Sequence, residues 1–548
     1  VLLAEASPRC GGWLNGVDDV EIDGRPAQDW MKKTLARLQA MENVSVLTRT
    51  TLFGYGDHNY LTLSETITDH LKDKPAHLPR MRMWKVRAQQ VILATGAIER
   101  PLVFSGNDLP GVMLASAAQT YLGEYGVLPG KRGIVMTNND ATWHIAFALQ
   151  EAGCLVKAIV DTRPSAAPAL KRQAESLGIE VLSGHGITAA HGHLKVARVE
   201  VSPLTADGTD ITGDALHIDC DCILMSGGLS PVVHLHSQAR GKLTWDEKTL
   251  CFRPSSAHEA EQSAGACNGS FDLQRGLKEA ITAAGKAAKA VGMAVQTVDV
   301  PVVDAPRINR SPMAVWSLPN GQGEGEKAFV DFQNDVTASD IKLAVREGYH
   351  SVEHVKRYTT TGMATDQGKT SNINALAILA DQLGEAIPEV GTTTFRMPYT
   401  PTSIGMIAGR SIGSLFDPVR TTQMDSLHRQ AGAKFEHVGQ WMRAWYYPKE
   451  GEDMEQAVSR EVLAARQAAG LLDASTLGKI DIKGPDAAEF LNRIYTNGWL
   501  KLKVGRCRYG LMCKDDGMVM DDGVTTRLAE DHFHMTTTTG GAAGVLYW

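Results

Sequence analysis

"KRGIVMTNNDATWHIAFALQEAGCLVKAIVDTR", residues 131–163, is the stretch that decides the fold of this chain. An apolar run, a polar turn, an amphipathic helical pattern and a second apolar run follow one another, which predicts one βαβ unit. The turn is Thr137-Asn138-Asn139-Asp140, whereas a dinucleotide-binding turn is rich in glycine so that the backbone can approach the pyrophosphate. We therefore expect an α/β unit whose turn is too bulky to hold a dinucleotide.

Two further segments, QVILATGAIERP at 90–101 and CILMSGGLSP at 222–231, each combine an apolar run with a turn of small residues. We expect both to be buried strands of a parallel sheet. Nucleotides bind at the carboxyl edge of such a sheet, which is where these turns lie. The pattern therefore predicts a nucleotide-binding fold that contains the 131–163 unit as a second α/β part.

The first residues, VLLAE at 1–5 and CGGWL at 10–14, fit the second strand of a dinucleotide-binding unit. The acid at that strand tip, here Glu5, accepts hydrogen bonds from the adenosine ribose. The glycine fingerprint belongs about 20 residues earlier, before Val1, so we expect the chain to be a fragment. A solvated strand end is the simpler explanation of Glu5 alone. Likewise, residues 265–292 predict a helix that either offers free N–H groups to a phosphate or is purely structural.

Composition describes an ordinary acidic globular protein. The 548 residues are 43% hydrophobic and 21% charged, with a net charge of -7. This balance favours neither nucleic acid nor an anionic membrane as a partner. No apolar run approaches the roughly 20 residues that cross a bilayer, and we expect a cytoplasmic protein. The eight cysteines are scattered and are expected to be buried thiols, His234 and His236 alternate as on a strand, and we predict no metal site.

The second half of the chain alternates helical patterns with turn-rich connections. Residues 336–348 and 351–359 predict two capped helices of a small module, which leads into the polar loop KRYTTTGMATDQGKTSN at 356–372. Residues 457–497 predict a helix, a strand and a second helix. An antiparallel hairpin pair is expected to follow, with a tight Asp-Asp-Gly turn.

Three of these stretches, at 94–113, 330–372 and 475–497, resemble the alpha subunit of heterotetrameric sarcosine oxidase, and the resemblance extends over almost the whole chain. It implies an oxidoreductase that converts sarcosine (N-methylglycine), O2 and tetrahydrofolate into glycine, hydrogen peroxide and 5,10-methylenetetrahydrofolate. It further implies that this chain binds NAD and folate, shares an FMN with the beta subunit, and assembles with beta, gamma and delta subunits. The FAD is then held by the beta subunit alone.

With this resemblance, the predicted fold class is α/β multidomain. A dinucleotide-binding domain of the FAD/NAD(P)-binding type carries an inserted βαβ domain, followed by a small helical ferredoxin-like module without cysteines and the start of an α+β aminomethyltransferase-like folate domain. The expected bounds are 1–100 and 222–298 for the dinucleotide-binding domain, 101–221 for the inserted domain, 299–328 for a linker or wrapping arm, 329–395 for the helical module, 396–430 for a connection and 431–548 for the folate domain. The first strand and most of the folate domain are expected to be missing.

The resemblance also implies positions for the NAD contacts. They are Glu5, Ala6 and Ser7 at the strand tip, Trp13 after the paired glycines, Leu52, and Ala266, Phe271 and Leu273 near the start of the later helix. Members of the family often carry an acidic pair at the strand tip and a small polar residue in place of Trp13. Ala6 and Trp13 therefore depart from the family pattern, and any contact there is expected to use the backbone.

For folate, the resemblance implies Tyr509, Asp521, Asp522, Thr537 and Thr538. A carboxylate there can hydrogen-bond the N–H groups of the pterin and orient the amine that captures the one-carbon unit, and Asp522 is the predicted catalytic residue. A plain turn at Asp521-Asp522-Gly523 is the alternative, because Asp and Gly favour turns for their own conformational reasons.

The helical module resembles a [2Fe-2S] domain of the bacterioferritin-associated ferredoxin type. Its cysteine positions correspond here to Asp331, Gln333, Asp366 and Ser371, and oxygen side chains cannot replace four thiolates around such a cluster. We therefore expect a scaffold without iron, whose loop residues Lys369, Thr370 and Ser371 donate hydrogen bonds to the phosphate of the FMN. The alternative is a loop that only packs on the beta subunit.

Two rival functions stay open. One is the alpha subunit of a related amine or proline dehydrogenase, which lacks a folate domain; residues 475–497 argue against it. The other is a largely structural scaffold subunit whose nucleotide takes no part in chemistry.

Overall fold

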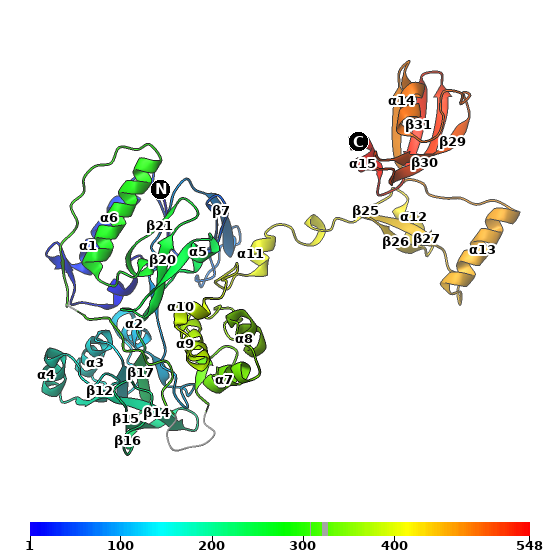
Figure 1. The fold of residues 1–548 in the computed structure, drawn as a ribbon. Coiled ribbons are helices and arrows are strands. Elements are labelled where there is room, and N and C mark those ends of the chain that lie inside the picture. Colours follow the sequence, from blue (N-terminus) through cyan, green and yellow to red (C-terminus); the bar gives the residue numbers. More distant parts are fainter. Residues whose placement is uncertain (307, 320–326) are drawn as a thin grey trace. The chain divides into compact units, whose positions relative to one another are not determined.

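The chain forms two compact units, Val1–Ile407 and Ala408–Trp548 (Figure 1). The computed structural model describes residues 1–306, 308–319 and 327–548. Positions 307 and 320–326, which belong to the predicted 299–328 linker, lie outside the described residues.

The 131–163 stretch forms the predicted βαβ unit, with β11 (Arg132–Thr137), α3 (Ala141–Glu151) and β12 (Leu155–Asp161). It lies in a five-stranded parallel sheet of order β10-β17-β11-β12-β13. The remaining strands are β10 (Val112–Leu114), β17 (Cys222–Ser226) and β13 (Glu180–Ser183). All five residues of β17 are buried, as expected for a strand covered on both faces.

The two faces of this sheet have different covers. Helices α2 (Ala115–Tyr125), α3 and α4 (Pro168–Ser176) supply Ala118, Trp143 and Leu170 to the cluster on one face. The other face packs against the antiparallel sheet β14-β15-β16, with strands β14 (His185–Gly192), β15 (Val196–Pro203) and β16 (Leu216–Asp219). The result is a three-layer arrangement around one apolar sheet.

The rest of the dinucleotide-binding part confirms the predicted strands and helix. β1 (Leu2–Ala4) pairs in parallel with β4 (Ser45–Leu47), and β8 (Val91–Leu93) pairs in parallel with β21 (Glu261–Ser263). The other elements are α1 (Ala27–Gln39), α6 (Leu273–Ala290), the antiparallel sheet β5 (Thr50–Gly56), β6 (Tyr60–Thr66) and β7 (Met81–Arg87), the pair β9 (Ala97–Glu99) and β18 (Leu229–Pro231), the pair β19 (Lys242–Asp246) and β20 (Cys251–Ser256), and β2 (Glu21–Ile22) between β3 (Arg25–Pro26) and β22 (Val303–Asp304).

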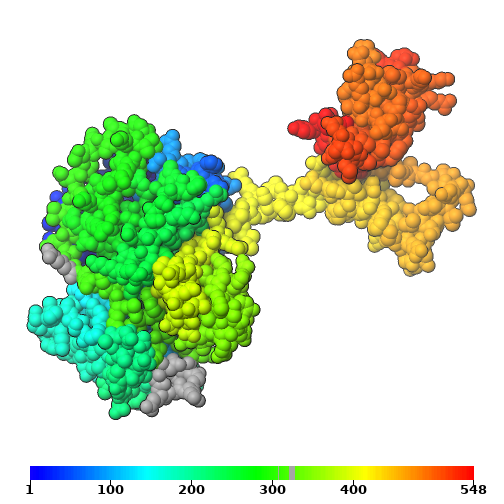
Figure 2. Space-filling model, viewed as in Figure 1, coloured from blue at the N-terminus to red at the C-terminus, as the bar shows by residue number. Residues whose placement is uncertain are grey.

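The small helical module also forms as predicted. A capping box starts α7, because the Thr337 hydroxyl accepts from the Asp340 N–H and the Asp340 carboxylate accepts from the Thr337 N–H. Its elements are β23 (Phe329–Asp331), β24 (Val336–Thr337), α7 (Ala338–Arg346), α8 (Val352–Thr359), α9 (Asn372–Leu383) and α10 (Ile387–Val390). Val103 of the α/β part belongs to the core of this module, and the two parts lie against each other in Figure 2.

Two expectations about histidines and cysteines need correction. His234 and His236 were expected on a strand, but they lie in the short helix α5 (His234–Gln238). Five cysteines are buried as expected, whereas Cys10 and Cys513 are half-buried and Cys507 is exposed on an edge strand.

His236 forms a buried pair that makes stability depend on pH. Its Nδ1 lies 2.7 Å from Oε2 of Glu261, and both side chains are 2% exposed. Burial alone would lower the pKa of His236, but the hydrogen bond and charge of Glu261 outweigh it and raise the pKa above its ordinary value. A raised pKa contributes stability that is full below the unfolded pKa of about 6.5 and is lost as pH rises through the folded value.

We therefore expect the urea midpoint of the wild type to fall between pH 6 and pH 9 through this contribution, and Glu261→Gln to remove that part of the slope. His185→Gln is the matched control, since His185 is half-buried and its Nδ1 donates to the Ser183 carbonyl, with no carboxylate partner among the described residues. An unchanged slope in Glu261→Gln would contradict the assignment.

The C-terminal unit contains the predicted order of helix, strand, helix and hairpins. Its main sheet is antiparallel, in the order β28-β31-β30-β29, and Leu491, Trp499 and Phe533 lie in the core beneath it. The elements are β25 (Arg420–Thr421), α12 (Asp425–Gln430), β26 (Lys434–Val438), β27 (Trp441–Tyr446), α13 (Met454–Gln467), β28 (Gly478–Lys483), α14 (Ala487–Ile494), β29 (Cys507–Cys513), β30 (Val519–Ala529), β31 (His532–Thr537) and α15 (Ala542–Tyr547). Within the described part of the chain, no helix is both long and apolar enough to cross a bilayer.

Candidate functional site

The predicted strand-tip residues form a tight turn after β1. The Glu5 N–H donates to the Leu47 carbonyl at 2.8 Å, and the Glu5 carbonyl accepts from the Thr50 N–H at 2.8 Å. The Glu5 carboxylate accepts from the Ser7 N–H at 2.8 Å. Glu5, Ala6 and Ser7 therefore lie together at the end of β1, and the carboxylate is held by the turn that it closes.

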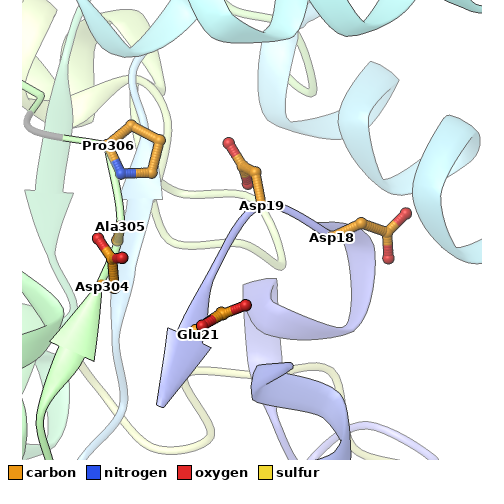
Figure 3. Close-up of a pocket in the computed structure, with 6 residues that line it drawn as sticks. All are labelled: Asp18, Asp19, Glu21, Asp304, Ala305 and Pro306. Carbon is orange, nitrogen blue, oxygen red and sulfur yellow. The ribbon is translucent and has the colours of Figure 1, made fainter. Parts of the chain in front are cut away.

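A pocket of about 380 Å³, lined in part by residues that follow the Gly12–Gly16 turn, does not suit a dinucleotide. Its lining includes four carboxylates, from Asp18, Asp19, Glu21 and Asp304, which Figure 3 shows around the same hollow. A pyrophosphate would be repelled by them. No group of three or more His, Cys, Asp or Glu is placed to hold a metal ion among the residues that the structure describes.

A second pocket, of about 350 Å³, opens beside the strand tip. It is lined by Ala6, Pro8, Arg49, Thr51, Phe53, Ser64, Thr66, His70, Met81, Thr400, Pro401 and Thr402. Thr51 and Phe53 flank the predicted contact Leu52 in β5, so the pocket joins two predicted NAD segments. Arg49 holds a left-handed backbone, φ 51°, and its N–H donates to the Ser7 carbonyl at 3.0 Å. Strained backbone of this kind is concentrated at ligand sites.

The remaining predicted NAD contacts lie around the start of α6. Ala266 is in the short 3-10 helix Gly265–Asn268, and Leu273 is the first residue of α6. Leu273 packs on the buried cluster that contains Leu14, which brings the Gly12–Gly16 turn with Trp13 close to α6. Trp13 itself is 50% exposed. The structure thus places Leu273 close to the Gly12–Gly16 turn that carries Trp13.

Of the four positions that the resemblance assigns to cluster cysteines, Asp331, Gln333 and Asp366 are linked by hydrogen bonds, and Ser371 is not. Asp331 is 2% exposed, and its carboxylate accepts from the N–H groups of Gln333 (2.9 Å), Asn334 (3.1 Å) and Gly362 (2.7 Å). The Gln333 side chain accepts from the Asp366 N–H at 3.4 Å. Ser371 is 1% exposed, and its hydroxyl makes no hydrogen bond in the described structure.

Lys369 is already engaged within this loop. Its Nζ donates to the Tyr399 carbonyl at 2.6 Å and lies 4.6 Å from the centre of the Tyr399 ring, and burial lowers its pKa. His234 stacks on the same ring at 5.4 Å, and burial with the Lys369 charge lowers the pKa of His234 to about 3. To reach a phosphate, Lys369 must break its hydrogen bond to the Tyr399 carbonyl. The Ser371 hydroxyl has no described hydrogen bond to break.

The alternative of a plain turn at Asp521-Asp522-Gly523 is wrong. These residues lie inside β30, where Asp522 pairs with Leu511 and Gly523 with Gly510. The same tripeptide occurs at Asp515-Asp516-Gly517, and that copy forms the turn, with Gly517 at φ 81°. Gly523 is needed for another reason, because a Cβ there would lie 1.9 Å from the Thr536 carbonyl oxygen.

The predicted folate residues do come together on β29, β30 and the end of β31. Asp521 is 4% exposed; its Oδ1 accepts from the N–H groups of Asp522 (2.8 Å) and Thr538 (3.1 Å). Its Oδ2 is buried and makes no hydrogen bond to any described residue. The Asp522 carboxylate accepts from the Tyr509 hydroxyl, and the Thr537 hydroxyl donates to the Thr538 carbonyl at 3.0 Å. Burying a carboxylate oxygen without a hydrogen bond costs free energy of folding. An N–H group of a ligand would supply the missing hydrogen bond to Oδ2 of Asp521.

Gly541 makes room for that carboxylate. A Cβ on Gly541 would lie 2.1 Å from Oδ2 of Asp521, while a Cβ on the neighbouring Gly540 would meet nothing within 4 Å. We expect Gly541→Ala to displace Asp521 and to weaken folate binding at least tenfold, as a lost charged hydrogen bond would. Gly540→Ala is the control and should bind as the wild type does in isothermal titration. Equal affinities for the two variants would contradict this placement.

One polar network escaped the sequence reasoning. The Tyr447 hydroxyl lies 2.6 Å from Nδ1 of His428, whose Nε2 lies 2.9 Å from Oδ2 of Asp473. Burial alone would raise the pKa of Asp473, but hydrogen bonds from Ser475 and His428 hold it well below its ordinary range. No motif joins residues so far apart in sequence, so only the tertiary structure reveals them.

Two family models match the chain. Residues 325–410 match the sarcosine oxidase A3 domain, and residues 424–548 match the GCVT N-terminal domain. The first covers the helical module, and the second covers the sheet that carries Asp521 and Asp522.

Similar proteins fall into three groups. The chain is 47% identical over 558 aligned residues to the sarcosine oxidase subunit alpha of Corynebacterium sp. (strain P-1), covering 100% of this chain and 57% of that protein. It is 37% identical over 115 residues to an aminomethyltransferase of Corynebacterium aurimucosum, covering 21% of this chain and 29% of that one. The L-proline dehydrogenase structure from P. horikoshii shares the fold, with a TM-score of 0.51 and 18% identity over 74% of each chain.

The chain is thus an α/β multidomain protein with a dinucleotide-binding fold and an aminomethyltransferase-like domain. It spans somewhat more than half the length of the curated alpha subunits that it matches. Its similarity to them, by contrast, runs through all of its own residues. Over its whole length, the chain is therefore similar to sarcosine oxidase alpha subunits.

Proposed function

We propose that this chain acts in a sarcosine oxidase, in which its C-terminal unit captures the one-carbon unit of the substrate on tetrahydrofolate. The observation that carries the proposal is the pair Asp521 and Asp522. One buried carboxylate oxygen of Asp521 has no described hydrogen-bond partner, and both residues lie in the segment that matches the GCVT N-terminal domain. Folate supplies the amine that accepts the one-carbon unit, and the two carboxylates orient the pterin and take up a proton.

NAD is proposed to bind at the tip of β1. The region offers the Glu5 carboxylate, the 350 Å³ pocket beside Ala6, and Arg49, whose guanidinium makes no ion pair with any described residue. An adenosine ribose would hydrogen-bond Glu5, and Leu52, Ala266, Phe271 and Leu273 would line the rest of the site. Trp13 and Ala6 contribute backbone only.

An FMN shared with a beta subunit is proposed at the polar loop of the helical module. The proposed donors to its phosphate are Thr370 and Ser371, whose buried hydroxyl makes no described hydrogen bond. Lys369 joins them only by leaving the Tyr399 carbonyl. Beta, gamma and delta subunits complete the proposed assembly, with the FAD in the beta subunit.

Ligand-induced thermal shifts test these assignments in the assembled enzyme. Tetrahydrofolate and NAD, each at about 100 times its dissociation constant, should stabilise the protein by about 2.7 kcal/mol and raise the melting temperature. A shift with NAD but none with tetrahydrofolate would leave only the scaffold or dehydrogenase role. Faster peroxide formation from proline than from N-methylglycine would favour the proline dehydrogenase.

A further inference from the structure

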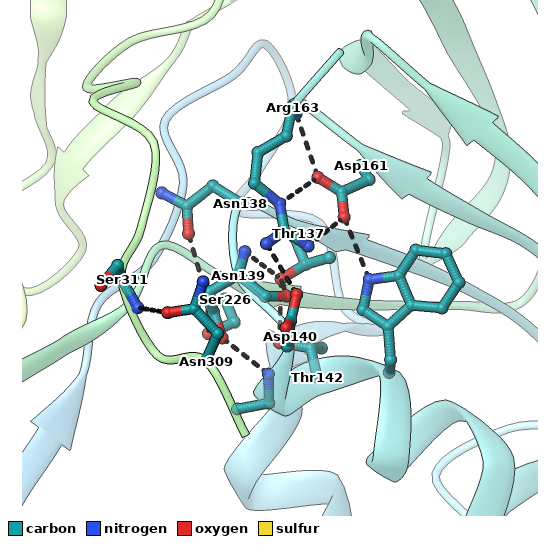
Figure 4. Close-up of polar contacts among 12 residues, drawn as sticks. Thr137, Asn138, Asn139, Asp140, Thr142, Asp161, Arg163, Ser226, Asn309 and Ser311 are labelled. Carbon is teal, nitrogen blue, oxygen red and sulfur yellow. Dashed lines mark hydrogen bonds and ion pairs between the residues drawn. The ribbon is translucent and has the colours of Figure 1, made fainter. Parts of the chain in front are cut away.

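The carboxyl edge of the five-stranded sheet is filled by its own side chains, as Figure 4 shows. The Thr137 hydroxyl donates to the Asn139 carbonyl and lies 3.0 Å from the Thr142 hydroxyl, and the Asn139 side chain accepts from the Ala141 N–H at 3.0 Å. In a doubly wound sheet, phosphate binds where a strand leads into the first turn of the next helix. Here the Ala141 N–H, in the first turn of α3, already donates to the side chain of Asn139.

The tip of β12 is closed in the same way. Asp161 is fully buried, and its Oδ2 accepts from Nε1 of Trp143 at 3.0 Å and from Nη2 of Arg163 at 2.7 Å. Arg163 also donates to Asp140 at 2.7 Å. An acid at this position binds the ribose in a dinucleotide site. In this chain the acid has internal partners instead.

A distant segment lies across this closed edge. The Asp140 N–H donates to the Asn309 carbonyl at 3.2 Å, and the Met313 N–H donates to the Asn138 carbonyl at 3.1 Å. In return, Nδ2 of Asn138 donates to the Met313 carbonyl at 2.8 Å. Figure 4 shows Asn309 and Ser311 beside Asn138 and Asn139. We call residues 309–318 the strap.

The strap is anchored by burial as well as by hydrogen bonds. Val315 is 6% exposed and Leu318 is 3% exposed, and both belong to the core cluster that contains Ile134 and Met136 of β11. The Leu318 N–H donates to the Val103 carbonyl at 2.8 Å. A segment with this burial and pairing is part of the folded core, whereas a linker that only spans two domains remains solvated.

We propose that the strap is the permanent occupant of the nucleotide edge of the five-stranded sheet. The surface that binds a dinucleotide in related folds binds a segment of the same chain here. The proposed position of the strap depends only on the contacts described above. Its corollary, that each chain binds one NAD at the β1 tip and none at this edge, rests on the proposed function.

Hydrogen exchange on the assembled enzyme tests the strap. Peptides covering 309–318 should exchange about 100-fold or more slowly than the exposed stretch around Val298, as expected for amides paired within a core. Met313→Pro removes the N–H given to Asn138 and should speed exchange of the strap about tenfold or more. Val298→Pro is the control, since Val298 is 59% exposed and its N–H makes no described hydrogen bond; it should leave the strap within twofold of the wild type.

Two outcomes would overturn the proposal: wild-type strap amides that exchange as fast as those around Val298, or two equivalents of NAD bound per chain in equilibrium dialysis. One equivalent, in the wild type and in Met313→Pro, supports it. If no NAD binds at all, the proposed NAD function fails, and the exchange rates alone still decide whether the strap is right.

Discussion

Replacing Asp522 by Asn is expected to lower the formation of 5,10-methylenetetrahydrofolate about 100-fold or more, the usual range for losing a positioned acid or base. The substitution keeps the shape of the side chain and the partner of the Tyr509 hydroxyl, but it removes the charge and the ability to take up a proton. Peroxide formation from sarcosine should stay close to the wild-type rate, because the proposed oxidation of the substrate occurs in another subunit.

The control is Asp515→Asn, in the first copy of the same tripeptide. Asp515 lies in the exposed turn between β29 and β30, and no described residue hydrogen-bonds its carboxylate. Both rates should remain unchanged in that variant. Equal losses of peroxide and methylenetetrahydrofolate in Asp522→Asn would place the defect outside the folate reaction and would contradict the assigned role.

The second large effect is on stability. Asp161→Ala should lower the free energy of unfolding of the Val1–Ile407 unit by about 3–5 kcal/mol, the cost of breaking a buried ion pair by removing one partner. The substitution leaves the Arg163 guanidinium, which is 15% exposed, with only one of its two carboxylate partners, and it leaves the buried Nε1 of Trp143 without an acceptor.

Urea denaturation followed by tryptophan fluorescence measures this change. Asp219→Ala is the matched control, because Asp219 pairs with Arg198 through side chains that are 63% and 55% exposed. Exposed pairs of this kind contribute little, so the midpoint should not move. A midpoint for Asp161→Ala as high as that of the control would show that the network at the sheet edge is not a source of stability.

Local patterns predicted the framework of both units. The 131–163 unit, the capped helices of the module and the helix-strand-helix order after residue 454 all formed, because each depends on periodicity and caps within a single segment. The absence of glycine in the Thr137–Asp140 turn was also readable, and it correctly pointed to bulky side chains at that edge.

What the patterns missed depends on pairing between distant segments. The strap could not be predicted, since Asn309 and Met313 meet the turn only after a return of about 170 residues along the chain. The alternative of a plain turn at Asp521-Asp522-Gly523 was wrong, because the two Asp-Asp-Gly tripeptides are locally identical and only the strand register distinguishes them. His234 and His236 were misplaced because two alternating residues fit a strand and a short helix equally well.

The most direct test of the account follows the methyl carbon of the substrate. Sarcosine labelled with ¹³C in its methyl group is supplied to the assembled enzyme with tetrahydrofolate and a formaldehyde scavenger, and the label is traced by NMR. Label is expected in 5,10-methylenetetrahydrofolate for the wild type and in the scavenger for Asp522→Asn. Label in the scavenger for both proteins would contradict this expectation.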